Sequence, residues 1–207
     1  STTSYPQVSY FRGSVKLEVD GQIYTIDLEA KALQVFKFFR SEAPRWVHFD
    51  YESSWIKELI FDKTTTELCH QLKYSGDILA KNAAINELVV IAQKPETDLA
   101  TRLQIQTALI EQIESKAYWR LRTNALVALR NLQPKQPGKS ALQLEPQIVA
   151  LLQRCIKVEA AWLKATAINF SGRTEDSSFA QIYLQALNDP SDRVINAAAI
   201  ALGKSKS

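Results

Sequence analysis

The residues of this chain that could carry out chemistry are few and scattered. The only histidines are His48 and His70, and the only cysteines are Cys69 and Cys155. Neither histidine has a second histidine or a cysteine pair at metal-ligand spacing, and the adjacent Cys69 and His70 would point about 100° apart on a helix. The sequence contains no His-Glu-x-x-His, no Gly-x-Ser-x-Gly and no glycine-rich phosphate loop. We therefore expect that this chain alone is not an enzyme and that it holds no metal or other cofactor.

A second chemical feature is a block of positive charge. Residues 116–173 carry 10 basic and only 2 acidic side chains, although the whole chain has a net charge of only +3. A long stretch of one sign is typical of a binding surface. Five of the cations in or beside the expected helices of this block are the candidate binding residues: Arg120, Arg122, Arg154, Lys157 and Lys164.

Two tryptophans, Trp119 and Trp162, are interleaved with these cations. One interpretation is a surface for a phosphate backbone, with aromatic rings that stack on bases. The other is a solvated basic face with both tryptophans in the hydrophobic seam between helices, and we place Trp162 in that seam. We expect an acidic protein surface as the partner of the basic block, rather than nucleic acid.

The first fifty residues read as antiparallel strands. Residues 15–19 and 23–28 alternate apolar and polar side chains around Asp20-Gly21, which is a hairpin turn signal. The aromatic-rich stretches 35–39 and 45–49 predict two further strands. About four strands form only part of a sheet, so we expect an exposed sheet edge through which the chain could self-associate.

From about residue 53 the apolar spacing becomes helical. We expect a short helix from Trp55, then four helical hairpins, in which Thr64, Asp98 and Asp189 are start signals and Gly203 is a stop signal. The expected helices cover 64–75, 78–92, 98–114, 117–132, 141–157, 159–171, 176–188 and 190–203.

A small residue recurs in the middle of an apolar row on four of these helices. The rows are Ala80, Ala84, Leu88; Leu121, Ala125, Leu129; Trp162, Thr166, Phe170; and Val194, Ala198, Leu202. Their middle positions lie 41, 41 and 32 residues apart, and recurrence at about forty residues is typical of HEAT or armadillo solenoids. The predicted fold class is α+β and mainly α, with a β-sheet segment over 1–52 and a HEAT-like α-α superhelix over 53–207.

A family resemblance lies in the segments that join sheet and helices. Residues 43–50, Ala-Pro-Arg-Trp-Val-His-Phe-Asp, precede the Trp55-Ile-Lys-Glu-Leu59 segment and the helices that contain 66–72 and 79–88. This order resembles the C-terminal portion of bacterial aminopeptidase N-like zinc metallopeptidases, where the end of a β-sandwich leads into HEAT-like repeats. The resemblance implies that the chain closes over a catalytic domain of the same parent protein and helps to confine peptide substrates. It also implies a zinc ion in that missing domain, and it assigns no catalytic or metal-binding residue here.

The alternative is a free-standing HEAT-repeat scaffold for protein partners, with no peptidase attached. The absence of methionine suggests a processed product or a piece of a longer protein. No apolar run approaches the roughly 20 residues of a membrane helix, and the start does not resemble a signal peptide. Buried thiols are expected for Cys69 and Cys155, but a disulfide between them stays open, so the compartment is not fixed.

Overall fold

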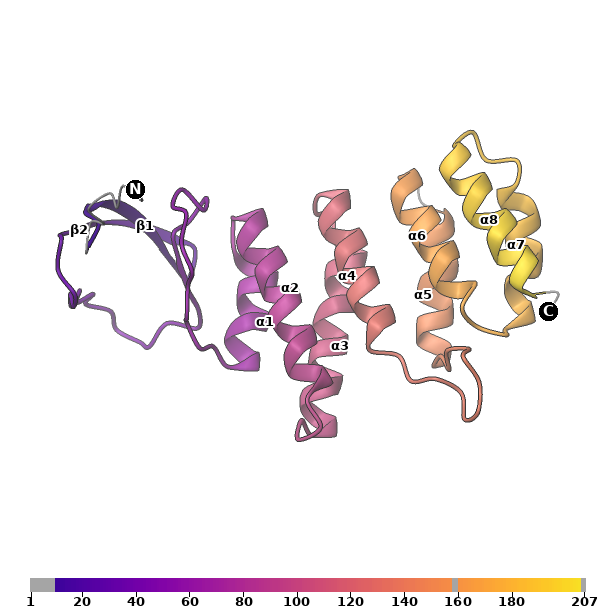
Figure 1. The fold of residues 1–207 in the computed structure, drawn as a ribbon, viewed down its shortest axis with the longest axis horizontal. Helices are drawn as coiled ribbons and strands as arrows, with labels where there is room; N and C mark the ends of the chain where they lie inside the picture. Colours follow the sequence, from indigo (N-terminus) through magenta and orange to yellow (C-terminus); the bar gives the residue numbers. More distant parts are fainter. Residues whose placement is uncertain (1–9, 158–159, 206–207) are drawn as a thin grey trace, which may run out of the picture. The chain divides into compact units, whose positions relative to one another are not determined.

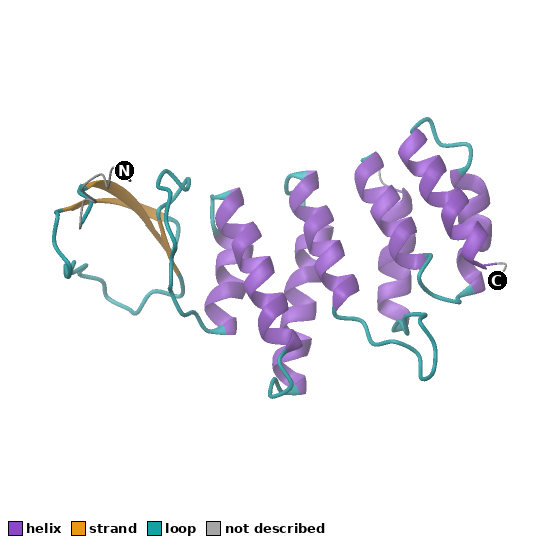
Figure 2. Ribbon diagram, in the orientation of Figure 1, coloured by secondary structure: helices purple, strands orange, loops and turns teal. Residues whose placement is uncertain are grey.

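The computed structural model describes residues 10–157 and 160–205. Within these residues the chain forms three strands followed by eight α-helices and one short 3-10 helix (Figures 1 and 2). The predicted fold class, α+β and mainly α, is confirmed. The chain divides into two compact units, Ser1–Ala84 and Ile85–Ser207, and the predicted change from strand to helix near residue 52 falls inside the first unit.

The sheet of the first unit consists of β1 (Gly13–Val19), β2 (Gln22–Leu28) and β3 (Val47–Phe49), all antiparallel and in the order β2-β1-β3. Asp20 and Gly21 have φ angles of 49° and 84°, the left-handed conformation that a two-residue hairpin turn requires. The predicted turn is therefore confirmed. Val15, Leu17 and Ile26 form the buried core of the sheet.

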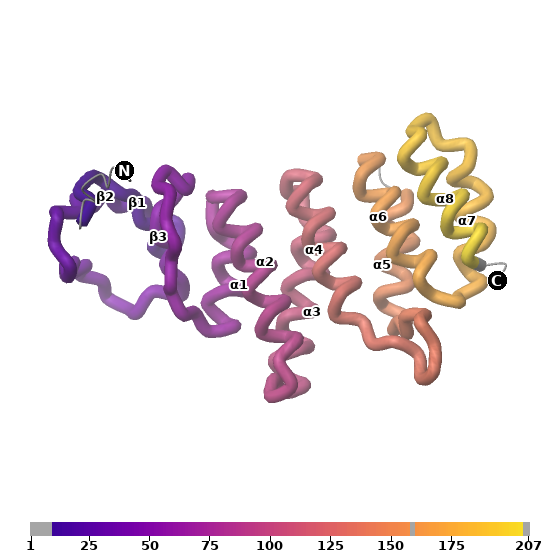
Figure 3. The backbone as a smooth tube through the Cα atoms, viewed as in Figure 1, coloured from indigo at the N-terminus to yellow at the C-terminus, as the bar shows by residue number. Residues whose placement is uncertain are grey.

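Two predicted elements of the first unit are wrong, and a third is shorter than expected. Residues 35–39 form no strand, and 55–60 form no helix. The tube in Figure 3 follows residues 29–46 as a long irregular connection between β2 and β3. The strand expected over 45–49 begins only at Val47, because the Asp20 carboxylate accepts the backbone N–H groups of Arg45 and Trp46 at 3.0 and 3.3 Å.

The expected helix at Trp55 does not form, because side chains bind the backbone N–H groups at its expected start. The Asp50 carboxylate accepts the backbone N–H groups of Ser54 and Trp55, each at 3.0 Å. The Trp55 indole donates to the Ser14 carbonyl at 3.0 Å and packs against the sheet core. These contacts hold 50–55 as a loop across the sheet.

Two of the predicted helix starts carry the capping side chains that the sequence indicated. Thr64 and Glu67 form a capping box at the start of α1, and Asp98 caps α3. The described helices are α1 (Thr65–Tyr74), α2 (Ile78–Gln93), α3 (Leu99–Glu114), α4 (Trp119–Asn131), α5 (Pro146–Lys157), α6 (Ala161–Ser171), η1 (Ser177–Phe179), α7 (Ala180–Ala186) and α8 (Asp192–Ser205).

Three helix boundaries on α5 and α8 differ from the prediction. Helix α5 begins at Pro146 rather than near 141, because Leu142 pairs with Lys135 and donates its N–H to the Arg173 carbonyl at 2.8 Å. Helix α8 begins at Asp192, since the Asp189 side chain caps the turn before the helix by accepting the Ser191 N–H at 2.9 Å. Helix α8 also passes through Gly203 instead of stopping there.

The small-residue rows are buried as predicted on α2 and α4, where all six side chains are buried. On α8, Val194 and Ala198 are buried while Leu202 is half-buried. On α6 the predicted row is only partly correct, because Phe170 is fully buried but Thr166 is half-buried and Trp162 is exposed. The row one residue further on, Leu163, Ala167 and Ser171, is fully buried. The buried face of α6 contacts α4, α5 and α8.

Candidate functional site

The five predicted basic residues lie at one edge of the second unit. Arg120 and Arg122 lie in the first turn of α4, Arg154 and Lys157 in the last turn of α5, and Lys164 in the first turn of α6. Since the hairpins run in the same sense, the last turns of α3, α5 and α7 and the first turns of α4, α6 and α8 share this edge, uppermost in Figure 1. We call it the turn edge.

Three of the five cations are engaged within the chain. The Arg122 guanidinium donates to the Ile113 carbonyl at 2.7 Å, and Arg154 forms an ion pair with Glu114. Lys164 lies 2.8 Å from a carboxylate oxygen of Asp189, and this contact lowers the pKa of Asp189. These three cations therefore hold neighbouring helix ends together. Arg120 and Lys157 are exposed.

The turn edge also carries a row of stacked side chains from three helices. The Trp119 and Trp162 rings are stacked, with centroids 5.3 Å apart and planes 21° apart. The Arg193 guanidinium carbon lies 3.3 Å from the Trp162 centroid, and that of Arg120 lies 5.5 Å from the Trp119 centroid. We call Arg120, Trp119, Trp162 and Arg193 the cation–aromatic ladder.

Sequence reasoning missed Arg193 as a member of this site. Arg193 lies outside the basic block, and the one-residue error on α6 placed Trp162 inside the helix seam instead of on the surface. The available signal was the position of Trp119, Trp162 and Arg193 at the start of the second helix in successive hairpins. Each of the three lies five or six residues before a buried alanine, namely Ala125, Ala167 and Ala198.

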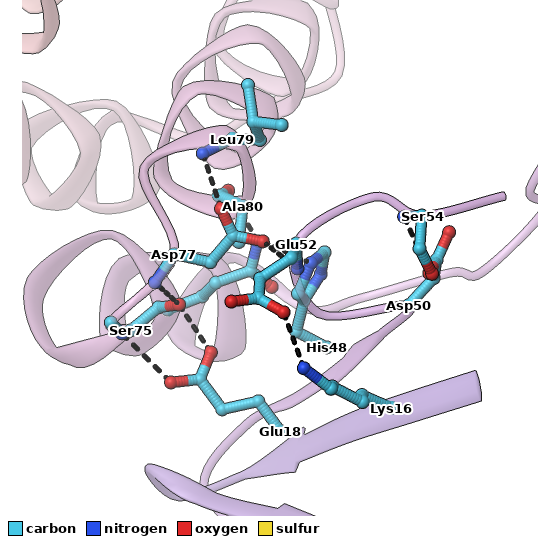
Figure 4. A network of polar contacts seen from close by, with 12 residues as sticks. Lys16, Glu18, His48, Asp50, Glu52, Ser54, Ser75, Asp77, Leu79 and Ala80 are labelled. Atoms are coloured by element: carbon cyan, nitrogen blue, oxygen red, sulfur yellow. Dashed lines mark hydrogen bonds and ion pairs between the residues drawn. The ribbon is translucent and has the colours of Figure 1, made fainter. Parts of the chain in front are cut away.

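A different polar cluster lies buried in the first unit (Figure 4). Glu18 on β1 is 1% exposed, and its carboxylate accepts the Ser75 hydroxyl and the Gly76 backbone N–H, the latter at 2.9 Å. The Asp77 carboxylate accepts the backbone N–H groups of Glu52 and Leu79 at 2.8 and 2.7 Å. We call Glu18, His48, Ser75 and Asp77 the polar clamp, because it fixes the turn between α1 and α2 to the sheet.

His48 lies directly opposite Glu18 in the sheet, and its Nε2 atom lies 3.4 Å from an Asp77 oxygen. Burial lowers the pKa of His48, and nearby Lys63 lowers it further, although Asp77 and Glu18 act in the opposite direction. Ser, His and Asp are thus all present, but the Ser75 hydroxyl donates to Glu18 and not to the imidazole. A serine nucleophile needs the imidazole as its base, so this arrangement is structural.

Asp50 organises the segment that follows β3. Its side chain is fully buried and accepts hydrogen bonds from Ser54, Trp55 and Lys57. Burial by itself would raise the pKa of Asp50, but these hydrogen bonds outweigh it and lower the pKa to about 2. Asp50 is therefore a carboxylate at neutral pH, and its role is to fix the loop.

The remaining groups offer little reactivity. The two cysteines are not joined in a disulfide; Cys155 is buried and Cys69 is half-buried, and burial raises the pKa of Cys155 to about 11. Such a thiol is a poor nucleophile. Over residues 10–157 and 160–205, His, Cys, Asp and Glu side chains nowhere gather in threes that could hold a metal ion. In the same residues, every helix is too short or too polar to cross a bilayer.

The sequence matches no protein-family model and no curated protein.

Proposed function

We propose that this chain is the non-catalytic C-terminal portion of an aminopeptidase N-like metallopeptidase. In that role it covers the catalytic part of the parent protein and helps to confine peptide substrates. The zinc ion and the cleavage chemistry belong to that other part. The proposal rests on the sequence resemblance and on one structural observation.

The observation is a concentration of exposed apolar side chains in the connections of the first unit. Phe39 is 98% exposed and Ile60 is 86% exposed. We call the full group the outer apolar set: Leu33, Val35, Phe36, Phe38, Phe39, Ile56, Leu59, Ile60 and Phe61. Single exposed apolar residues are normal on a protein surface, but so many within thirty residues favour a surface that another protein part covers.

A hollow beside this set supports the same interpretation. It has a volume of about 440 Å³, and its lining includes Leu17 and Val19 of β1, Val47 of β3 and Phe38 of the outer apolar set. Leu17 and Val19 are buried, and Arg40, Ser41 and Glu42 also line the hollow, so it offers room for a side chain of a covering part without exposing the sheet face itself.

Asp50 gives a physical reason for the residues that carry the resemblance. The Phe49-Asp50 pair, Trp55 and Lys57 belong to the quoted segments, and the Asp50 carboxylate binds both Trp55 and Lys57. These residues thus act together as one structural unit around the buried Asp50 carboxylate. Such a unit would fix the end of a sandwich.

The complete reading frame that contains these 207 residues provides the test. We expect its product to carry a His-Glu-x-x-His motif with a downstream glutamate, to bind zinc and to hydrolyse an aminoacyl-p-nitroanilide in a chelator-sensitive manner. The chain alone should not hydrolyse it. A complete product that lacks both the motif and the activity would refute the proposal and leave the scaffold alternative, which the turn edge favours because its ladder is already arranged for contact.

A further inference from the structure

We propose that the turn edge is a docking surface for an acidic protein segment, and that Arg120 and Arg193 of the cation–aromatic ladder receive its carboxylates. The ladder occupies first turns of α4, α6 and α8 in the second unit. This inference goes beyond the proposed function and does not depend on a peptidase parent. An interaction scaffold could use the same surface.

The ladder holds its two arginines in place before any partner arrives. An arginine side chain loses considerable rotamer freedom when it binds, and stacking on an aromatic ring removes part of that cost in advance. Arg193 lies 3.3 Å from the Trp162 centroid, and Trp162 in turn stacks on Trp119. The flat guanidinium of Arg193 covers the ring and leaves its N–H edge for a carboxylate, which such an edge can bind through two hydrogen bonds.

The local charge also favours an anionic partner. Glu114 and Asp189, acidic residues of this edge, are already paired with Arg154 and Lys164. Helices α4 and α6 have no acidic residue in the first turn and no side-chain cap at the N-terminus. The exposed Asp192 lies beside Arg193 on α8 and reduces the positive charge there. Arg120, Lys157 and Arg193 remain exposed to a partner.

The stacking favours acidic protein over nucleic acid. Single-stranded nucleic acid binds to aromatic side chains mainly by stacking bases on open ring faces. Here Trp119 covers one face of Trp162, and Arg193 lies against the same ring. A base would have to displace Arg193, whereas a carboxylate uses Arg193 where it is.

The test measures binding of a short peptide of alternating glutamate and serine, labelled with an uncharged dye, by fluorescence anisotropy at low salt. A control peptide has glutamine in place of every glutamate and therefore carries no side-chain carboxylate. We expect this control peptide to bind far more weakly. The double variant Arg120→Glu, Arg193→Glu should lower the affinity for the glutamate peptide by about tenfold or more. The matched control is Lys135→Glu, Arg173→Glu, which makes the same charge change at exposed residues outside the turn edge and should have little effect.

A third variant separates the ladder from bulk charge. Trp162→Leu keeps the net charge but removes the ring that supports Arg193, so we expect it to weaken binding as well. Thermal unfolding followed by circular dichroism verifies that each variant is folded. The proposal is wrong if the wild-type chain does not bind the glutamate peptide, if the control weakens binding as much as the ladder variant, or if Trp162→Leu binds normally. It is also wrong if an oligothymidylate strand binds the ladder more tightly than the peptide.

Discussion

At the scale of single residues, the side chains that suggested chemistry serve as structural links. His48, Ser75 and Asp77 contain the residue types of a catalytic triad, yet the Ser75 hydroxyl donates to Glu18 and the cluster is buried. Asp50 likewise accepts four hydrogen bonds from three residues of its own loop. Sequence types alone could not predict these roles, because Glu18 and Ser75 lie 57 residues apart and meet only when the sheet and α1 are in place.

The polar clamp predicts a pH dependence of stability. Because the pKa of His48 in the folded chain lies below its ordinary value of 6.5, the unfolded chain takes up a proton first as the pH falls. The stability that His48 contributes is therefore complete above about pH 6.5 and declines as the pH falls from there through the lower folded pKa. Replacing His48 by Asn should flatten the decline in melting temperature between about pH 7.5 and 5.5. His70→Asn is the control, and an equal decline in the His48 variant would exclude this role.

Replacing Asp50 should lower the stability of the folded chain more than replacing His48 does, and it should do so already at neutral pH. Asp50→Asn leaves Lys57 without its partner anion and removes charge-assisted hydrogen bonds, so the free energy of unfolding should fall by about 2–3 kcal/mol. Asp62→Asn replaces an exposed aspartate nearby and should change it by less than about 0.5 kcal/mol. Urea denaturation measures the free energy of unfolding of both variants. If Asp50→Asn were as stable as Asp62→Asn, the structural role of Asp50 would be contradicted. The wild-type contribution should disappear only as the pH falls from about 4 toward 2.

At the scale of elements, local sequence signals predicted the helices and the β1–β2 hairpin, but they did not predict every helix boundary or which face of each helix is buried. The capping box at Thr64 and the turn at Asp20-Gly21 are local chemistry, and both were predicted correctly. The side of α6 that is buried depends on which neighbours it contacts, and Trp162 fits an apolar row as well as Leu163 does. The strand expected at 35–39 failed for the same reason, since an apolar alternation forms a strand only beside a partner strand.

Replacing either of two glycines near the contact between α6 and α8 by alanine should change the free energy of unfolding, in opposite directions. A Cβ atom added at Gly172 would lie 2.9 Å from the Cβ of Ala201, whereas nothing lies within 4 Å of one added at Gly203. Gly172→Ala should lower the free energy of unfolding by about 1–3 kcal/mol through overpacking. Gly203→Ala should raise it by up to about 1 kcal/mol, because alanine favours the helix. Thermal or urea denaturation that found no difference between the two variants would contradict the close approach of these helices.

At the scale of the whole molecule, the exposed apolar groups predict self-association of the isolated chain. β2 and β3 are the outer strands of the described sheet, and the outer apolar set lies in the same unit. Light scattering should therefore show an average mass that rises with concentration. The double variant Phe39→Ser, Ile60→Ser should reduce this rise, while Leu99→Ser, an exposed apolar residue of the second unit, should not. A strict monomer at high concentration would contradict the prediction.

The class of fold could be predicted from periodicity, whereas the candidate sites could be predicted only in part. The five basic residues do share the turn edge, because the lengths of the predicted helices place the hairpin turns together. The pairing that engages Arg122, Arg154 and Lys164 could not be predicted, since it depends on which acceptors lie at the end of α3 and in the turn before α8. Arg193 and the polar clamp depend on tertiary contacts in the same way.

The central proposal is that this chain is a covering part whose outer apolar set would lie against the rest of a larger protein. Hydroxyl-radical footprinting with mass spectrometry measures this directly, by comparing side-chain labelling in the isolated chain, at a dilution where it is monomeric, with labelling in the product of the complete reading frame. We predict that labelling of Phe39, Ile56 and Ile60 falls severalfold in the complete protein, while labelling of the exposed Leu99 stays the same. Equal labelling of the three residues in both proteins would contradict the account.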